Sequence, residues 1–294
     1  MKDHVKRILH TFPGHQTVFR MLRNVPGLPE GLWKHLYFEG EFLVPIENHT
    51  FLLRHSGHRV ENEIFWKGIF GQWEAHSLRI WFYLAKKSDG IIDVGANSGI
   101  YSLLAYVANP QGMVVAFEPL PEAFKLLQEN ISINNFCILP FQAAVSDSIG
   151  TSTLFGSSDD FQYSASLVGD FSIGMSAKST VVTTTIDHLI DEQPNIKIDL
   201  IKIDVEGAEI SVLKGMRETL EKQQPNLIIE ILNDESENYV RKISEEYDYK
   251  YVWIDETAGL KKTRPEDVAS RNVLLIHAAD LENLIHDCPE ILFS

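Results

Sequence analysis

Short apolar runs and amphipathic segments alternate along the chain from residue 90 onward. In each amphipathic segment, apolar residues recur at the spacing of one helix face. Five runs are expected to be strands: Ile91–Val94, Met113–Phe117, Ile138–Ala144, Ile198–Ile203 and Asn226–Ile231. Helices are expected over Gly99–Val107, Glu122–Asn130, Ala208–Leu220 and Ser236–Tyr247. Strands that are apolar on both faces, with helices between them, predict a parallel sheet covered on both sides.

The last part of the chain predicts how this sheet is completed. Lys250–Ile254 and Asn272–His277 are expected to form a closing antiparallel pair, which makes a mostly parallel seven-stranded sheet. With right-handed crossovers, this is an α/β, doubly wound, Rossmann-like fold. Residues 155–182, rich in Ser and Gly, interrupt the alternation. They are either a loop that closes over a ligand or a surface excursion, and Val181–Thr185 adds a small strand.

The N-terminal stretch has a different pattern, rich in aromatic residues and punctuated by prolines. Glu41–Ile46 and Thr50–Arg54 predict two short strands around a turn. Trp73–Lys87 has the apolar spacing of a helix that leads into the main domain. We therefore expect a cap over residues 1–72 and a main domain over residues 73–294.

Composition narrows the class of protein. The 294 residues, 44% of them hydrophobic, suit one sizeable α/β domain with an extension. A formal net charge of −15 repels phosphate backbones, so we expect no nucleic-acid substrate.

No apolar run reaches the roughly 18 residues that span a bilayer, and Met1–His10 lacks the apolar core of a signal peptide. Cys137 and Cys288 are expected to be free thiols in a cytoplasmic protein, and the glycosylation sequons at Asn48 and Asn130 to be chance matches.

A glycine-containing loop follows the first strand of the main domain. The segment Asp93–Gly99 (DVGANSG) lies where a strand ends and a helix begins, at the sheet edge where ligands bind. Gly95 and Gly99 allow a tight turn and a close backbone approach to the ligand. The dinucleotide fingerprint G-x-G-x-x-G needs a glycine where Asn97 stands, which argues against a pyrophosphate. The Asp93 carboxylate instead suits a ligand that carries an ammonium group.

The next two strands end in residues that suit a nucleoside. Glu118 follows the second strand, and a carboxylate there accepts hydrogen bonds from the two hydroxyls of a ribose. Ala143 and Ala144 leave room for a flat base. Asp147, or a backbone N–H near it, is expected to meet the adenine edge, although a structural turn residue explains Asp147 nearly as well.

Two charged residues fall in a strand that should be apolar. Lys202 and Asp204 are two residues apart, so they share a face while the strand continues. A lysine inside a sheet is costly unless it is paired. The two residues are either an ion pair that neutralises both charges or a polar cluster beside the reacting atoms.

These segments together resemble the FkbM family of class I methyltransferases. The resemblance covers roughly Glu74 to Leu232. The matching stretches are Ile92–Gly99, Ala116–Pro119, Ala143–Asp147, Thr185–Asp187, Ile198–Glu209 and Pro225–Glu230. Six motifs in order at compatible spacings are far more specific than one glycine loop.

The resemblance implies S-adenosylmethionine as methyl donor and a hydroxyl group as methyl acceptor, on a sugar, glycolipid or polyketide. It implies a cofactor site that includes Glu74, which either reaches the methionine end of the cofactor or is a solvated helix-start residue. The other expected cofactor residues are Asp93, Gly95, Ala96, Asn97, Gly99, Glu118, Pro119, Ala143, Ala144, Asp147 and Asp204.

Methyl transfer to a hydroxyl needs a base that takes the hydroxyl proton as the new bond forms. Asp204 is the first choice for this base and Glu206 the second, with Lys202 in a supporting catalytic role. His188 is an alternative base. Asp204, Glu206 and Glu230 are alternatively expected to hold a divalent cation that polarises the acceptor oxygen. No H-E-x-x-H pattern is present, which argues against zinc.

Two other functions are compatible with the same fold. One is a NAD(P)-dependent oxidoreductase, against which the absent middle glycine argues. The other is a non-catalytic protein that binds S-adenosylmethionine, against which the intact Asp93, Glu118 and Asp204 argue. The acceptor and the oligomeric state do not follow from the sequence.

Overall fold

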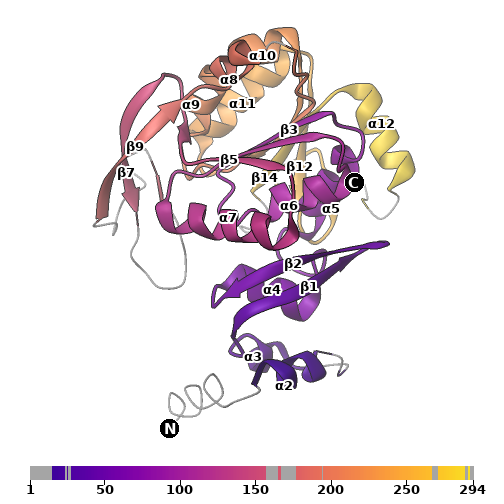
Figure 1. The fold of residues 1–294 in the computed structure, drawn as a ribbon. Helices are drawn as coiled ribbons and strands as arrows, with labels where there is room; N and C mark the ends of the chain where they lie inside the picture. Colours follow the sequence, from indigo (N-terminus) through magenta and orange to yellow (C-terminus); the bar gives the residue numbers. More distant parts are fainter. Residues whose placement is uncertain are drawn as a thin grey trace. The chain divides into compact units, whose positions relative to one another are not determined.

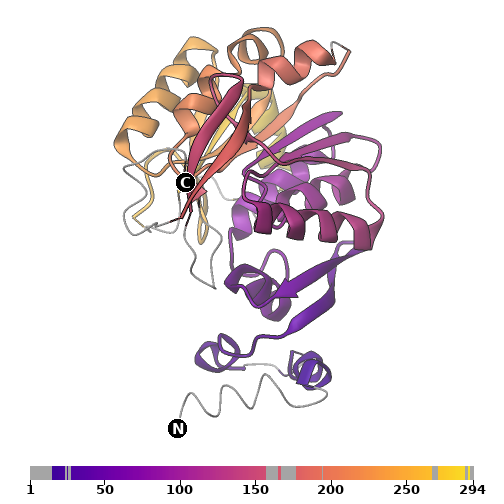
Figure 2. The same ribbon diagram turned by 60° about the vertical axis from the view of Figure 1, so that its left-hand side comes forward.

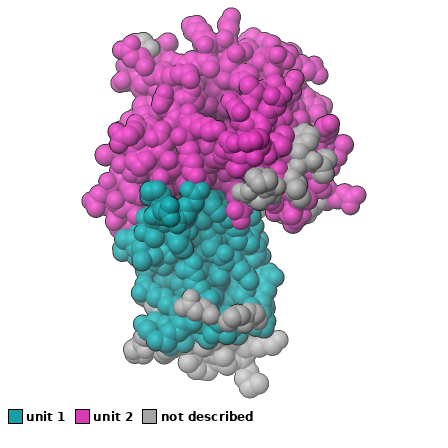
Figure 3. Space-filling view, turned by 90° about the vertical axis from the view of Figure 1, so that its right-hand side faces the viewer, with its two compact units in different colours: residues 1–75 teal, residues 76–294 magenta. Residues whose placement is uncertain are grey.

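The structure is a computed structural model, and it describes residues 15–23, 25, 28–156, 165–166, 177–193, 195–266, 271–288 and 291. The chain divides into two compact units, residues 1–75 and 76–294 (Figure 3). Among the helices of these ranges, none has the length and apolar character needed to cross a membrane.

The first unit is built on an antiparallel hairpin of β1 (Glu39–Ile46) and β2 (His49–Ser56). From Phe42 to Ile46, buried and exposed residues of β1 alternate, as a strand with one covered face requires. Sequence patterns predicted the two strands but not the helices, which are α2 (His15–Leu22), α3 (Glu30–Trp33) and α4 (Arg59–Lys67). In α4, residues 61–66 are all buried, so its sequence lacks the one-sided periodicity that marks a surface helix.

The second unit confirms the predicted α/β, doubly wound fold. Its main sheet has the order β13-β12-β14-β11-β10-β3-β4-β5. The strands are β3 (Gly90–Val94), β4 (Met113–Phe117), β5 (Ile138–Phe141), β10 (Leu200–Ile203), β11 (Asn226–Glu230), β12 (Lys250–Asp255), β13 (Gly259–Lys261) and β14 (Asn272–Ile276). The neighbours from β11 to β5 are parallel, whereas β14 is antiparallel to both β11 and β12. The seven predicted strands are therefore present, and the short β13 adds an eighth.

Helices cover both faces of this sheet (Figures 1 and 2). One group consists of α5 (Ala75–Ala85), α6 (Ile100–Ala108) and α7 (Pro121–Asn134). The opposite group consists of α8 (Ile186–Glu192), α9 (Glu209–Lys214), α10 (Arg217–Lys222) and α11 (Asp234–Glu246), and α12 (Ala278–Asp287) follows β14. The inner strands are apolar on both sides because each face packs against helices, and every residue of β3, β10 and β14 is buried.

Two predicted elements are wrong in their bounds. The helix expected over Ala208–Leu220 is interrupted at Gly215, where a Cβ atom would lie 2.0 Å from the Ser146 carbonyl oxygen. The strand expected over Ile138–Ala144 ends at Phe141, and Ala144–Val145 forms β6 in a second sheet.

The second sheet has the order β6-β9-β7-β8, with β7 at Gly150–Gly156, β8 at Ala165–Ser166 and β9 at Ala177–Thr184. In Figures 1 and 2, β7 and β9 run side by side, apart from the main sheet. The small strand predicted at Val181–Thr185 corresponds to the end of β9. Most of the predicted interruption, residues 157–164 and 167–176, lies outside the described residues.

Candidate functional site

The strand order reverses at β3, because the chain continues from β3 to β4 on one side and later places β10 on the other. In open α/β sheets, such a switch point opens a crevice at the carboxyl ends of the strands, where ligands bind. The glycine loop after β3 and the segment after β10 flank this point. Asp204 N donates to Val94 O at 2.9 Å, and a Cβ atom on Gly95 would lie 1.8 Å from Asp204 O. The two motifs are therefore in direct backbone contact.

The glycine loop is fixed by neighbours on two elements, β4 and α7. Gly95 N and Ala96 N both donate to Phe117 O, at the end of β4, at 2.9 Å. The Asn130 side chain of α7 donates to Ser98 O at 2.8 Å and is fully buried. A sequon at Asn130 is therefore inaccessible, and this asparagine positions the loop.

Backbone conformation sets the residue types of this loop. Gly99 has a φ of 89°, and a Cβ atom there would lie 2.5 Å from a methyl carbon of Leu127. Asn97 has a φ of 49°, a left-handed conformation in which asparagine is enriched among non-glycine residues. Where the dinucleotide fingerprint has a glycine, this chain has Asn97, a residue type that tolerates the left-handed backbone region.

Glu118 joins the second strand to the glycine loop. One carboxylate oxygen accepts the Asn97 N–H at 2.8 Å, and the other accepts the Leu120 N–H at 2.8 Å. Burial raises the pKa of Glu118 to about 7, although both N–H groups favour the charged form. Each carboxylate oxygen keeps a further lone pair for a ribose hydroxyl, and ribose contact stays a prediction.

Asp93 lies inside the unit, with 1% of its surface exposed. Its carboxylate accepts the Ser102 hydroxyl of α6 at 2.5 Å, and its Cα pairs with that of Lys202 across β3 and β10. Burial raises the pKa of Asp93 to about 6, against the Ser102 hydrogen bond and the Lys202 charge. The carboxylate thus ties the β3 end to α6 beside a buried cation.

Lys202 is the buried cation of the site, with 1% of its side chain exposed. Its ammonium donates to an Asp204 carboxylate oxygen at 3.1 Å and lies 5.1 Å from the centre of the Tyr101 ring. The Asp204 side chain is 28% exposed, so the ion pair joins a buried partner to a partly exposed one. The ion-pair interpretation of the sequence is therefore confirmed, whereas a polar cluster beside the reacting atoms stays a prediction.

Glu230 is the third charged group of this cluster. It ends β11, and burial, together with the nearby charge of Asp204, raises the pKa of its carboxyl. Two carboxylates close together cannot both ionise at low cost. Glu230 is therefore the member that keeps its proton and hydrogen bonds to Asp204.

A tight turn follows Asp204. Glu206 and Gly207 both have positive φ angles, 51° and 100°. The buried Glu209 holds this turn, because its carboxylate accepts the Gly207 N–H at 2.7 Å and the Ser236 hydroxyl at 2.9 Å. A non-glycine residue kept in the left-handed region marks a constrained backbone. Here that residue is Glu206, the second candidate for the base in the sequence analysis.

A family model described as the methyltransferase FkbM domain matches residues 93–251, more than half of the chain. The chain belongs to the FkbM methyltransferase family. The matched range contains the glycine loop, Glu118 and the whole of the Lys202–Asp204–Glu230 cluster.

Curated relatives of this FkbM-family chain are similar over about half of its length. Methyltransferase sdnD of Sordaria araneosa is 30% identical, over 48% of this chain and 65% of the relative. Hexuronic acid methyltransferase AglP of Haloferax volcanii is 30% identical, over 53% of this chain and 61% of the relative. 2-O-methyltransferase NoeI of Sinorhizobium fredii is 29% identical, over 47% and 62%. The chain thus spans less than two thirds of the length of these relatives.

A solved structure of similar fold is that of methyltransferase FkbM from Methylobacillus flagellatus KT. It has 17% sequence identity and a TM-score of 0.42, over 64% of this chain and 43% of that chain.

The expected adenine residues lie at the ends of β4, β5 and β6. Ala143 and Ala144 are buried, and Pro119 is half-buried after Glu118. Asp147 is exposed in the turn between β6 and β7, with its Cα against Gly215 and a carboxylate oxygen that accepts the Ser148 hydroxyl. The turn interpretation accounts for these contacts, and contact with adenine stays a prediction.

Three other expectations from the sequence have separate outcomes. Glu74 belongs to the first unit and has a φ of 43°, so its cofactor contact stays a prediction. His188 lies on α8, where its backbone N–H donates to the Thr185 hydroxyl. Asp187 of the family motif caps α10, because its carboxylate accepts the N–H groups of Glu218 and Thr219.

The divalent-cation alternative finds no support. In the part of the chain that the structure describes, no group of three His, Cys, Asp or Glu side chains is arranged to hold a metal ion. The Asp204 carboxylate instead accepts a hydrogen bond from the Lys202 ammonium, and burial together with the Asp204 charge raises the pKa of Glu230.

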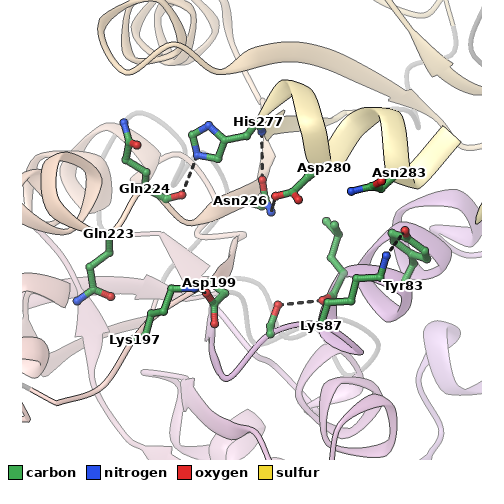
Figure 4. A pocket seen from close by; sticks show the side chains of 12 residues that line it. Tyr83, Lys87, Lys197, Asp199, Gln223, Gln224, Asn226, His277, Asp280 and Asn283 are labelled. Carbon is green, nitrogen blue, oxygen red and sulfur yellow. Dashed lines mark hydrogen bonds and ion pairs between the residues drawn. The ribbon is translucent and has the colours of Figure 1, made fainter. Parts of the chain in front are cut away.

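A polar cavity of about 400 Å³ lies at the opposite edge of the sheet, at the amino ends of β10 and β11 (Figure 4). The fold already uses its polar groups. Asn226 donates to Asp280 at 2.9 Å and accepts the His277 N–H, while Asp199 accepts the Asp89 N–H at 2.8 Å. Parallel α/β sheets bind ligands at the carboxyl ends of their strands, whereas this cavity lies at the amino ends, so it is distinct from the candidate site.

Proposed function

We propose that the protein is an S-adenosylmethionine-dependent O-methyltransferase that acts on a hydroxyl group of a small molecule, on a sugar, glycolipid or polyketide-type acceptor. The observation that carries the proposal is the direct contact between Gly95 and Asp204 at the switch point. It joins a ligand-binding loop to an acidic residue that is held by a buried lysine.

The chemistry of the groups at this edge fits the cofactor. S-adenosylmethionine offers an ammonium, a sulfonium and two ribose hydroxyls, all of which favour acceptors or negative charge. The ends of β3, β4, β10 and β11 carry the carboxyl groups of Asp93, Glu118, Asp204 and Glu230. The carboxylates of Asp204 and of ionised Glu118 would repel a pyrophosphate at this edge, which supports a methyl donor over a dinucleotide.

Bound S-adenosylmethionine supplies an electrophilic methyl group on its sulfonium. Asp204 accepts the proton of the acceptor hydroxyl while the oxygen attacks, so the oxygen does not have to develop a full positive charge. The Lys202 ammonium pairs with Asp204 at 3.1 Å and orients its carboxylate before the reaction. Glu230 keeps its own proton on the hydrogen bond to Asp204, which limits the negative charge of the cluster.

One relative is named a hexuronic acid methyltransferase, which supports a sugar as acceptor, and another is named a 2-O-methyltransferase, which supports transfer to an oxygen. The formal net charge of −15 supports a small molecule or glycan over a nucleic acid.

Two experiments test the proposal. Calorimetry with S-adenosylhomocysteine and with NAD should show binding of the first and not of the second. Incubation with radiolabelled S-adenosylmethionine and a panel of hydroxylated acceptors should then show label transfer that Asp204→Asn abolishes. Binding of NAD alone, or full transfer by Asp204→Asn, contradicts the proposal.

A further inference from the structure

Besides the charged Asp204, the buried Lys202 ammonium has a second hydrogen-bond partner, which is neutral. It donates to the side-chain oxygen of Asn272 at 3.3 Å. Asn272 is the first residue of β14, is 2% exposed, and pairs with Glu230 across β11 and β14. The antiparallel strand thus brings a residue from late in the chain to the charge cluster.

A directional chain of hydrogen bonds fixes how the Asn272 amide is oriented. The Ser77 hydroxyl donates its proton to a Glu256 carboxylate oxygen. Since a hydroxyl has one proton, Ser77 offers only a lone pair to Asn272. The Asn272 NH₂ group therefore faces Ser77, at 3.0 Å, and its oxygen faces Lys202.

Glu256, at the far end of this series of hydrogen bonds, is held by backbone N–H groups. The second carboxylate oxygen of Glu256 accepts the N–H groups of His76 and Ser77, at 2.8 and 3.3 Å. These N–H groups belong to the first turn of α5, where a helix has no internal acceptors for them. Glu256 is thereby fixed, and so is the direction of each hydrogen bond from Glu256 to Lys202.

We propose that Asn272 is a positioning residue for the reaction. With Ser77 and Glu256, it holds the Lys202 ammonium against Asp204, the base of the proposed methyl transfer on which this inference rests. Asn272 takes one ammonium proton without adding a second negative charge, so the cation's charge acts on Asp204. Ser77, Glu256 and Asn272 all lie outside the family-matched range of residues 93–251.

The first test needs no methyl acceptor. The Lys202 ammonium is observed in ¹⁵N–¹H spectra of the full-length protein and is assigned by its loss in Lys202→Arg. We expect slow hydrogen exchange of this ammonium in the wild type, and exchange faster by roughly tenfold in Asn272→Leu and Ser77→Ala, as for loss of one buried hydrogen bond. Asn226→Leu is the matched control, because it removes the amide at the other end of β11 and leaves the chain to Lys202 intact. Unchanged exchange in both variants overturns the inference.

The second test is kinetic. With an acceptor that the wild type methylates, Asn272→Leu should lower kcat roughly tenfold and leave the KM for S-adenosylmethionine and the Kd for S-adenosylhomocysteine unchanged. Asn272→Asp adds a negative charge beside the cluster, so it should move the acid limb of the kcat/KM profile to higher pH.

The outcomes separate this inference from the proposed function. If Asn272→Leu is unfolded at the assay temperature, Ser77→Ala carries both tests, since it leaves Asn272 in place. An active wild type with variants of equal kcat and equal pH profile overturns the positioning role alone. A wild type that methylates no hydroxyl acceptor overturns the proposed function, whereas the exchange measurement still decides whether Asn272 holds Lys202.

Discussion

Gly95 and Asp204 are more than one hundred residues apart in the sequence, yet their backbones touch. A Cβ atom on Gly95 would lie 1.8 Å from the Asp204 carbonyl oxygen, and Gly95 has a φ of 82°. The glycine loop and the segment after β10 therefore form one junction, in which a change on one side displaces the other.

Gly95→Ala should disrupt this junction. The left-handed backbone alone costs about 1–2 kcal/mol for a residue with a Cβ atom, and the clash with Asp204 O adds to it. We expect a lower melting temperature and loss of S-adenosylhomocysteine binding by calorimetry. Gly31→Ala is the control, because a Cβ there has no neighbour within 4 Å. Wild-type affinity in Gly95→Ala would show that the loop and Asp204 are not coupled.

Glu118 should make cofactor binding depend on pH. Its pKa in the free protein is raised to about 7, and ribose hydroxyls would bind its ionised form. Between pH 8 and pH 6 the ionised fraction falls roughly tenfold, so the affinity for S-adenosylhomocysteine should fall by a similar factor. Calorimetry across this range should show a flatter dependence in Glu118→Gln, and an equally steep one would exclude Glu118 as the titrating group.

The same shift should affect stability. Because the folded-state pKa is raised from 4.5 to about 7, the contribution of Glu118 to stability is complete below pH 4.5 and is lost as pH rises through 7. The effect reaches up to about 3 kcal/mol. Denaturant unfolding should show the wild type losing stability relative to Glu118→Gln between pH 5 and pH 8. A difference that does not change over this pH range would mean that the carboxylate is ionised throughout.

Asn130 should matter for the cofactor although it does not face it. Asn130→Leu leaves the Ser98 carbonyl without its buried donor, which costs about 1–3 kcal/mol. We expect a lower melting temperature and weaker S-adenosylhomocysteine binding. Asn134→Ala, one helical turn along α7, is the matched control, because its amide donates to the Asn130 carbonyl oxygen of the same helix. Equal effects of the two substitutions would rule out a specific role in the loop.

Glu230 and Asp204 should respond differently to amide substitution. Asp204→Asn removes the base and should lower kcat by about 10²–10⁴-fold. Glu230→Gln should keep activity within a few-fold, because burial and the Asp204 charge already keep Glu230 protonated, and an amide donates the same hydrogen bond. Steady-state assays at pH 7 compare the two variants. An equal loss in both would mean that Glu230 acts as an ionised carboxylate.

The parts of the fold that follow from local pattern were predictable. β3, β4, β10 and β11 are apolar on both faces because they lie inside the sheet, and the loops after them carry the polar residues of the site. The Lys202–Asp204 pair was also predictable, since residues two apart on a strand share a face.

The features that depend on distant partners were not predictable. The residues around Gly215 in the sequence do not indicate that Ser146 packs against Gly215, so the helix was predicted without a break. Likewise Asn130 resembled a glycosylation sequon and Asn272 an ordinary strand residue. Their roles arise from Ser98 and Lys202, which only the folded chain brings to them.

The position of β14 between β11 and β12 determines where the protein can be truncated for expression. A fragment cut at residue 251, where the family match ends, would lack β14 and leave the fully buried residues Leu227, Ile228 and Ile229 of β11 on an open sheet edge. Open apolar edges recruit strands from other molecules. Such a fragment should aggregate during expression, and a soluble minimal catalytic unit has to extend through Ile276.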